Sequence, residues 1–311
     1  MVNSINPLVS IIIPSYNHSK YVEDAILSVL VQTYENIQLI VIDDASIDDS
    51  VNKITSLREK RSDKFVFLKN DQNIGLQRSL IKALQEVRGE YIGIIASDDM
   101  LISTKVELLM SFIQRNNLDG AYASGFVLGE DGKKTLMDMT KVEKMFKDKT
   151  YLDQIYTSDC IGALFQSGLF KTGMMRNIDY IREKFWSDDW AIAIKLMESY
   201  HIGFLNEPTV IYRIHEGNTY KNYWNTFPGR VQVVSCLTPK ALRPKALANL
   251  FISQADYLIH DGEKKFAYRF YLAALVMNFS WNQILKYLLV LVFNVRICLS
   301  KFKRKINYLL N

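Results

Sequence analysis

An apolar run that ends in two adjacent carboxylates, Ile94-Ile95-Ala96-Ser97-Asp98-Asp99, constrains the fold of this chain more than any other stretch. The run is short, rich in β-branched residues and preceded by Gly89, which favours a buried strand over a helix. Charged groups cannot stay in such a core, so Asp98 and Asp99 are expected at the strand's end. Ligands bind beyond the carboxyl ends of parallel strands, and carboxylate oxygens there suit Mg²⁺ or Mn²⁺. On these two residues alone, a solvated turn or a helix N-cap explains the pair at least as well.

The bulk composition is that of an ordinary globular protein. The 311 residues are 49% hydrophobic and 23% charged, enough for one large core or two domains. The three cysteines are far apart and form no CxxC pair, which predicts neither a disulfide framework nor a structural zinc site. Residues 1–7 lack the basic and apolar regions of a secretory signal, and we expect a cytoplasmic protein.

The net charge of +5 is unevenly distributed along the sequence. Nine basic residues and no acidic residue follow Glu263, so subtracting nine from +5 leaves −4 for residues 1–263. The nine are Lys264, Lys265, Arg269, Lys286, Arg296, Lys301, Lys303, Arg304 and Lys305. Because the basic character belongs to the C-terminal part, the net charge gives no reason to expect a nucleic-acid partner.

Strand patterns alternate with helix patterns over the first hundred residues. Amphipathic stretches at 21–30 and 75–87 predict helices. Apolar, β-branched runs predict strands at 9–13, 37–42, 65–68 and 91–96. This alternation predicts the α/β class, with a mostly parallel sheet flanked by helices.

Polar residues follow three of these strands. Tyr16 follows the first strand after Pro14, Asp43 and Asp44 end the second, and Asp98-Asp99 ends the fourth. Carboxyl ends of parallel strands share one edge of the sheet, where an aromatic ring could stack on a base and carboxylates could bind ribose or a metal-bound diphosphate. There is no GxGxxG or GxxxxGK[ST] stretch, which argues against a dinucleotide enzyme or a P-loop NTPase.

The order of these motifs carries a resemblance. They are Pro14-x-Tyr16-Asn17, Asp43-Asp44-x-Ser46-x-Asp48-x-Ser50, Asn73-x-Gly75, Gly89-Glu90-Tyr91-Ile92 and Ser97-Asp98-Asp99. Each is weak alone, but the ordered set resembles family-2 inverting glycosyltransferases over residues 9 to about 220. The resemblance implies the nucleotide-sugar-binding fold called GT-A, a nucleotide-diphosphate sugar donor and a divalent metal, Mn²⁺ or Mg²⁺.

The resemblance also implies roles for individual residues. Pro14, Tyr16, Asp43 and Asp44 match nucleoside-binding positions, whereas Asp98 matches the ribose or metal position and Asp99 the metal position.

Two positions depart from the family pattern. Many relatives read Asp-x-Asp-Asp where this chain reads Ala96-Ser97-Asp98-Asp99, which leaves open which aspartate ligates the metal. Relatives often place Arg-Asn where Leu80-Ile81 stand here, so Arg78, two residues earlier, is the candidate diphosphate contact.

A second acidic pair, Asp188-Asp189, opens a helical stretch at residues 191–198. On that evidence alone the two acids are N-terminal caps. The resemblance implies instead that Asp189 is the base that takes the acceptor hydroxyl proton in an inverting transfer. It likewise implies that His215, in the Tyr212-Arg213-Ile214-His215 segment, contacts the donor or the metal; a structural histidine is the alternative.

The remaining sequence suggests how the chain is divided. A strand at 119–128 and a turn at 129–134 precede a charged stretch, 141–149, that we interpret as a solvated connector. We expect a catalytic domain at 1–225, with a nucleotide-sugar part (1–125) and an acceptor-side part (126–225), and a basic helical region at 226–311.

The C-terminal region is the expected membrane contact. Helix patterns at 241–260 and 264–278 precede an apolar stretch, 281–299, that is too short between its charges to span a bilayer. We interpret it as a helix in the cytoplasmic membrane interface whose lysines and arginines reach anionic headgroups. A lid or a dimer contact is the alternative, and the oligomeric state is not set by the sequence.

The function expected from the resemblance is transfer of one sugar to a hydroxyl of a glycan or lipid-linked glycan. Bacterial O-antigen, capsule or other surface-polysaccharide synthesis is the expected setting. A non-catalytic sugar-nucleotide or glycan-binding subunit is the alternative from another class, and retention of Asp98, Asp99 and Asp189 argues against it. A sugar-1-phosphate nucleotidyltransferase would need a glycine-rich N-terminal phosphate loop, which the sequence lacks.

Overall fold

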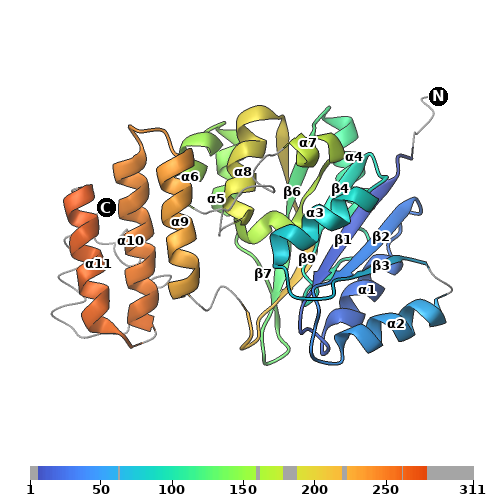
Figure 1. The fold of residues 1–311 in the computed structure, drawn as a ribbon. Coiled ribbons are helices and arrows are strands. Elements are labelled where there is room, and N and C mark those ends of the chain that lie inside the picture. Colours follow the sequence, from blue (N-terminus) through green and yellow to red (C-terminus); the bar gives the residue numbers. More distant parts are fainter. Residues whose placement is uncertain are drawn as a thin grey trace. The chain divides into compact units, whose positions relative to one another are not determined.

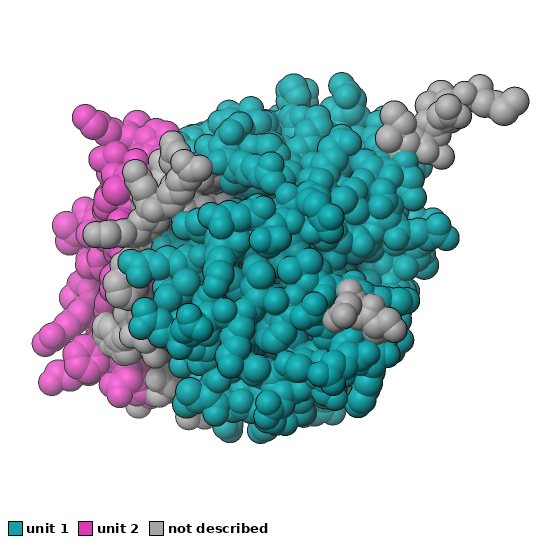
Figure 2. All heavy atoms as spheres, turned by 45° about the vertical axis from the view of Figure 1, so that its right-hand side comes forward, with its two compact units in different colours: residues 1–155, 159–221 teal, residues 156–158, 222–311 magenta. Residues whose placement is uncertain are grey.

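The computed structural model describes residues 6–61, 64–158, 162–177, 188–218, 223–260 and 262–278. The chain divides into two compact units, residues 1–155 with 159–221, and residues 156–158 with 222–311 (Figure 2). The sequence predicted a catalytic domain that ends at residue 225. The roles expected for its nucleotide-sugar part (1–125) and its acceptor-side part (126–225) stay predictions.

The first unit is built on one sheet, which contains nine strands in the described part of the chain (Figure 1). The strands are β1 (Val9–Ser15), β2 (Ile37–Asp43), β3 (Val66–Lys69), β4 (Tyr91–Ile94), β5 (Met100–Leu101), β6 (Gly120–Leu128), β7 (Lys134–Leu136), β8 (Leu169–Lys171) and β9 (Ile202–Arg213). Their order is β3-β2-β1-β4-β8-β6-β9-β5, with β7 paired to β6. β1, β2, β3 and β4 run parallel, as do β6 and β9, whereas β5, β7 and β8 pair antiparallel. The α/β prediction is confirmed.

Helices cover both faces of this sheet. The helices of this unit are α1 (Val22–Leu30), α2 (Ser50–Lys60), α3 (Leu76–Glu86), α4 (Lys105–Arg115), α5 (Thr140–Lys147), the 3-10 helix η1 (Gly162–Ser167), α7 (Thr172–Asn177) and α8 (Asp188–Ser199). Helix α6 (Tyr151–Thr157) includes residues of both units. Ile11 and Ile13 point into a core cluster shared with α1 and α4, whereas Ile12 is buried on the opposite side, where α3 packs on β1 and β2. A strand buried on both faces must be apolar at every position, which is why β1 reads as a continuous hydrophobic run.

The expectation of a solvated connector at 141–149 is wrong. The structure has helix α5 there, with Val142 and Met145 buried. Phe146 stacks between Tyr151 and Phe204, at ring-centroid distances of 5.5 and 5.7 Å. The three apolar residues of the helix recur at intervals of three and four, which places them on one face among charged neighbours.

The second unit contains three helices in its described part, α9 (Tyr223–Leu237), α10 (Arg243–His260) and α11 (Lys264–Met277). Phe227, Phe251 and Phe270 pack against one another with ring centroids 5.3 to 5.5 Å apart. Among the residues that the structure describes, no helix combines the length and apolarity that a membrane crossing requires. The expected interfacial helix at 281–299 and the basic residues to 311 lie outside the described residues.

Candidate active site

The parallel strands bring the predicted polar residues to one edge of the sheet. β1, β2 and β4 run in the same direction, so Tyr16, Asp44 and Asp98 follow strands that end on the same side. Pro14 is paired with Ile42 near the end of β1, and Tyr16 beyond it is 42% exposed. An exposed ring at this edge is available to stack on a flat ligand.

The acids that follow β2 are buried and hold their own loop. Both carboxylate oxygens of Asp43 accept hydrogen bonds from Ser46, one from its backbone N–H at 2.8 Å and one from its hydroxyl at 2.7 Å. Asp44 accepts from the Asn70 amide and the Ile74 N–H through Oδ1, and from the Gly75 N–H through Oδ2. Burial works to raise the pKa of Asp44, but these hydrogen bonds outweigh it and hold the pKa below its ordinary value.

The acid at the end of β4 faces two histidines instead. Asp98 Oδ2 lies 3.0 Å from His215 Nε2 and 3.9 Å from His18 Nε2. His18 belongs to the loop after β1, and His215 to the segment after β9. The fold therefore brings together three groups that are 80 to 197 residues apart in sequence, and only Asp98 and His215 of them were predicted.

Each imidazole is oriented by a second contact. His18 Nδ1 lies 2.8 Å from the Ser97 hydroxyl, and the N–H of Gly217 donates to His215 Nδ1 at 3.2 Å. The ring of Tyr21 lies against His215, with centroids 4.6 Å apart. Burial lowers the pKa of His18, and the Asp98 carboxylate offsets part of this effect.

Asp99 is more buried than Asp98, and it connects the loop after β4 to β9 by a hydrogen bond. Its Oδ1 accepts the backbone N–H of Arg213 at 2.8 Å, while Arg213 Nε donates to the Asp98 carbonyl at 3.0 Å. The Arg213 guanidinium also pairs with Asp24 at 2.9 Å and lies 4.8 Å from the centroid of the Tyr21 ring. Burial, and then the charge of Asp98, raise the pKa of Asp99 to about 8.

The residues around Asp98 fit a divalent cation. His18, Asp98 and His215 each offer one ligand atom, and these atoms lie within 4.8 Å of one another. A carboxylate combined with imidazole nitrogen suits Mn²⁺ or a later transition metal better than Mg²⁺, which favours oxygen ligands. Asp99 was expected at the metal as well as Asp98; of these two aspartates, the structure brings Asp98 to the histidines, while Asp99 is 1% exposed.

Asp189 and Arg78 are exposed on helices of the same unit. Asp189 lies in the first turn of α8, and the next residue, Trp190, is 1% exposed and donates its Nε1–H to the Ile155 carbonyl. That anchor fixes the start of α8 and so the position of Asp189. Burial, and then the charge of Asp189, raise the pKa of Tyr122 in β6. Arg78 lies in the first turn of α3, beyond the Gly75 that Asp44 holds.

Three residues that contribute to the site were not singled out from the sequence. They are His18, Arg213 and Asn218, whose amide donates to the Arg213 carbonyl at 3.1 Å and lies 3.4 Å from Asp98 Oδ2. His18 stands in the loop that follows a predicted strand, four residues after Pro14, and that position is the signal by which it could have been found.

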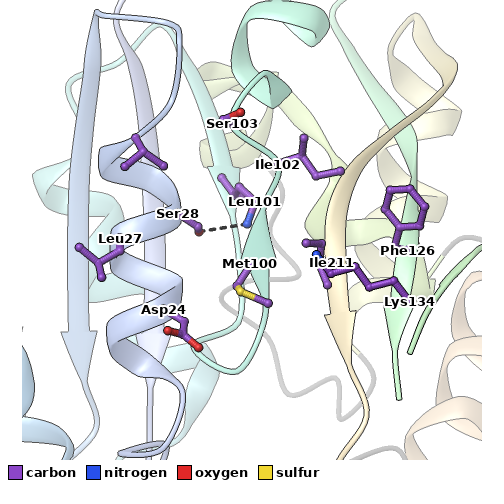
Figure 3. A pocket seen from close by; sticks show the side chains of 11 residues that line it. Asp24, Leu27, Ser28, Met100, Leu101, Ile102, Ser103, Phe126, Lys134 and Ile211 are labelled. Atoms are coloured by element: carbon purple, nitrogen blue, oxygen red, sulfur yellow. Dashed lines mark hydrogen bonds between the residues drawn. The ribbon is translucent and has the colours of Figure 1, made fainter. Parts of the chain in front are cut away.

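A cavity of about 490 Å³ lies between α1 and the strands β5, β6 and β9 (Figure 3). It is lined by Asp24, Leu27, Ser28, Val31, Met100, Leu101, Ile102, Ser103, Phe126, Lys134 and Ile211. Asp24, the ion-pair partner of Arg213, is the one acid in this lining, and none of the predicted site residues belongs to it. We therefore assign no step of the chemistry to this cavity.

Comparison with known proteins decides the family. The model of the family Glycosyl transferase family 2 matches residues 10–174, more than half of the chain. The chain belongs to glycosyltransferase family 2. The predicted family is thereby confirmed.

Relatives of this glycosyltransferase match over parts of their length. An uncharacterized glycosyltransferase of Rickettsia felis is 34% identical over 125 residues, which are 40% of this chain and 20% of that protein. The putative teichuronic acid biosynthesis glycosyltransferase TuaG of Bacillus subtilis is 31% identical over 126 residues, 40% of this chain and 50% of TuaG. The match thus spans from a fifth to half of these relatives.

Solved structures share the fold of this family 2 enzyme. TarS 1–349 of S. aureus, in complex with UDP-GlcNAc, superposes with a TM-score of 0.58 at 17% identity, covering 86% of this chain and 81% of TarS 1–349. The mannosyltransferase PcManGT of Pyrobaculum calidifontis, in complex with GDP-Man and Mn²⁺, gives a TM-score of 0.60 at 15% identity, covering 90% and 78%. At this identity the likeness establishes the fold.

Proposed function

We propose that this glycosyltransferase moves one sugar, with inversion, from a nucleotide-diphosphate donor to a hydroxyl of a glycan or lipid-linked glycan. The observation that carries the proposal is the cluster of Asp98, His18 and His215 at the carboxyl edge of the parallel strands. UDP-GlcNAc in TarS and GDP-Man with Mn²⁺ in PcManGT support a nucleotide-sugar donor and a divalent cation for a chain of this fold.

In this proposal the donor lies along the edge formed by β2, β1 and β4. Tyr16 stacks on the base beside Pro14, and Asp43 and Asp44 bind the nucleoside. Arg78 contacts the diphosphate. A cation bound at Asp98 would neutralise charge on the departing diphosphate.

Asp189 is the proposed general base. An inverting transfer requires one carboxylate that takes the proton of the acceptor hydroxyl while that oxygen attacks the anomeric carbon, and no covalent enzyme intermediate forms. The exposed position of Asp189, fixed by the buried Trp190, suits a group that must reach an incoming acceptor.

For the setting, we propose synthesis of a bacterial surface polysaccharide at the cytoplasmic face of the membrane. TuaG, named for teichuronic acid biosynthesis, supports this at the level of a relative. The basic stretch at 281–311 would bind anionic lipid headgroups, an attraction worth about 1 kcal/mol per basic residue near the surface that weakens with salt. Flotation with anionic vesicles tests this, and failure to float at low salt would contradict it.

The test of the function is a panel of UDP-, GDP- and dTDP-sugars, each with and without Mn²⁺. A donor that binds the folded protein raises its melting temperature, and we expect one nucleotide class to do so more strongly with Mn²⁺. Release of the nucleoside diphosphate with an acceptor glycan then distinguishes an enzyme from a sugar-nucleotide-binding subunit, which would bind the donor without turnover. Absence of any stabilisation across the panel would contradict the proposal.

A further inference from the structure

The cavity beside α1 has an apolar wall that the proposed transfer does not use. Three residues of this wall are cross-strand partners: Met100 in β5 pairs with Ile211 in β9, and Ile211 pairs with Phe126 in β6. Paired residues of neighbouring strands direct their side chains to the same face of a sheet. The row continues to Leu136 in β7, which pairs with Phe126, so it crosses four strands, or about 14 Å.

The opposite wall, formed by α1, is fixed to the segment that follows β5. The Leu101 N–H donates to the Ser28 hydroxyl at 3.0 Å (Figure 3). Just beyond α1, the Gln32 side chain donates to the Ile102 carbonyl at 2.8 Å, and the Thr33 N–H donates to the Ser103 carbonyl at 2.9 Å. Because these hydrogen bonds hold both walls, the space between them is formed before any ligand arrives.

Apolar surface stays open to water at both ends of this space. Val31, on the α1 side, is 59% exposed, and Leu136, at the β7 end of the row, is 58% exposed. A single exposed apolar residue needs no explanation, but these two continue one apolar lining that includes Leu27, Phe126 and Ile211. A contiguous apolar surface of this kind is typical of a binding site.

One positive charge lies beside the apolar wall. The Lys134 side chain extends from β7 toward Ile211 (Figure 3). The one acid of the lining, Asp24, is already paired with Arg213 at 2.9 Å. Among the residues that the structure describes, no ion pair involves Lys134. The lining therefore offers an uncompensated cation to a ligand.

The size of the cavity favours a small molecule over a protein partner. Its volume of about 490 Å³ lies within the range of roughly 300–1,000 Å³ that is typical of small-molecule sites. A stable protein interface needs about 800 Å² from each partner, whereas this lining is a slot between one helix and one row of strand residues.

We propose that this cavity binds an amphipathic anion that has a single alkyl chain and one acid group. The chain lies between α1 and the row from Met100 to Phe126, and the acid group pairs with Lys134. A fatty acid and a lipid phosphate share this chemistry. The site lies apart from the residues proposed to bind the donor, and its occupation requires no sugar nucleotide.

The experiment is a calorimetric titration of the full chain with decanoate, decyl phosphate and decanol, each below its micelle-forming concentration. We expect both acids to bind at one site per chain. From hexanoate to decanoate, each added CH₂ should tighten binding about fourfold, because the chain leaves water for the apolar lining. Tighter binding of decanoate identifies a fatty acid as the ligand, and tighter binding of decyl phosphate identifies a lipid phosphate; either order supports the site.

The acid group is tested by Lys134→Gln. An ion pair with an exposed lysine contributes little, so we expect this variant to bind both acids about three- to fivefold more weakly and to bind decanol as the wild type does. Lys133→Gln is the matched control, because Lys133 is the exposed neighbour and does not line the cavity. It should leave all three affinities unchanged.

The alkyl chain is tested by Val31→Asp, which brings a carboxylate to the apolar lining. Desolvation of that charge should weaken binding of all three amphiphiles by about tenfold or more. Leu76→Asp, at a leucine that is 50% exposed and outside the cavity, should change none of them. Because Val31 and Leu76 are exposed, both variants should fold, and their melting temperatures without ligand check this.

The contrary outcomes are distinct. A wild type that binds none of the amphiphiles, or affinities that are unchanged in both Lys134→Gln and Val31→Asp, would overturn the assignment. A wild type that sediments as a dimer while Val31→Asp sediments as a monomer would show that a second copy covers this face, and would also overturn it. Failure of every nucleotide sugar to stabilise the wild type would contradict the proposed function and leave this site in place.

Discussion

The same dipeptide, Asp-Asp, ends two parallel strands that flank β1, yet the two pairs have opposite surroundings. The Asp43–Asp44 pair meets N–H and hydroxyl donors of its own and the following loop, at Ser46, Ile74 and Gly75. In the Asp98–Asp99 pair, Asp98 meets two imidazoles and Asp99 accepts the backbone N–H of Arg213. The pKa of Asp44 is lowered, whereas that of Asp99 is raised to about 8.

The comparison shows that burial alone does not determine the pKa of an acid. Asp44 and Asp99 are both buried, and burial works to raise the pKa of each. Fixed N–H donors complete the electrostatics of the first pair, so it stabilises a loop. Among the described residues, the second pair accepts one backbone N–H, from Arg213 to Asp99 Oδ1, and a positive ligand at Asp98 would add the compensating charge.

The largest expected effect is that of Asp98→Asn. The amide keeps the shape of the side chain but loses the charge that a cation needs. We expect donor binding to lose its Mn²⁺ dependence and transfer to fall by about 10⁴-fold, with the free energy of unfolding little changed. Titration calorimetry with and without Mn²⁺, together with product formation, measures this. Mn²⁺-dependent donor binding at wild-type strength would refute the role of Asp98.

The Asp189→Asn variant separates binding from transfer. Since the proposed base acts on the acceptor, donor affinity should stay near the wild-type value while transfer falls by about 10²–10⁴-fold. Donor titration and turnover on the same preparation provide the measurement. Turnover at the wild-type rate would show that the proton is taken by another group.

The first acidic pair is tested by Asp44→Asn, which should act on stability. In the wild type, N–H donors of Asn70, Ile74 and Gly75 meet both carboxylate oxygens of Asp44. In the variant, the NH₂ group of the new amide would face some of these donors, so we expect the free energy of unfolding to fall by about 2 kcal/mol. Chemical denaturation measures the loss, and Asp98→Asn is its control.

The pH dependence of the same variant follows from the sign of the shift. Because the folded-state pKa of Asp44 lies below its ordinary value of 3.8, its contribution is present above that value and is lost as pH falls below it. Asp44→Asn should therefore lose less stability than the wild type on acidification below about pH 4. A variant as stable as the wild type at pH 7 would mean that the loop does not depend on Asp44.

The sequence predicted those parts of the fold that are determined locally. Strands such as 9–13 and 37–42 are apolar at every position because both faces of the sheet are covered, and the acids after them had to leave the core. Helix α2 was missed, since only Ser50, Ile54 and Leu57 of it are buried within a largely polar stretch. β8, three residues long, carries too little pattern to reveal its place between β4 and β6.

The different surroundings of the two acidic pairs could not be predicted, because their partners are distant in sequence. Asp44 is held by residues 26 to 31 positions away, whereas Asp99 is bonded to Arg213 and Asp98 to His215, 114 and 117 positions away. Such contacts depend on the order of strands in the sheet. The motifs around the two dipeptides suggested different roles, but only the folded chain shows which groups each carboxylate contacts.

The smallest effect on the free energy of unfolding at neutral pH is expected for a substitution at Lys105. This first residue of α4 is fully buried and donates through Nζ to the carbonyl of Gln166, whose side chain neighbours Asp99. Burial lowers the pKa of Lys105 to about 7, from 10.5. Between these values the folded state binds fewer protons than the unfolded state, so the free energy of unfolding rises with pH, by up to about 1.4 kcal/mol per unit.

Lys105→Met should remove this slope, because an apolar side chain of similar length takes up no proton. We expect the stability difference between wild type and variant to be small at pH 7 and to grow in favour of the wild type toward pH 9, as measured by chemical denaturation. Subtracting the variant's free energy of unfolding from that of the wild type removes the contribution of every other titrating group. The control is Lys60→Met, at an exposed lysine, which should leave the pH dependence of the free energy of unfolding unchanged. Equal slopes in Lys105→Met and the wild type would mean that Lys105 is charged in the folded protein.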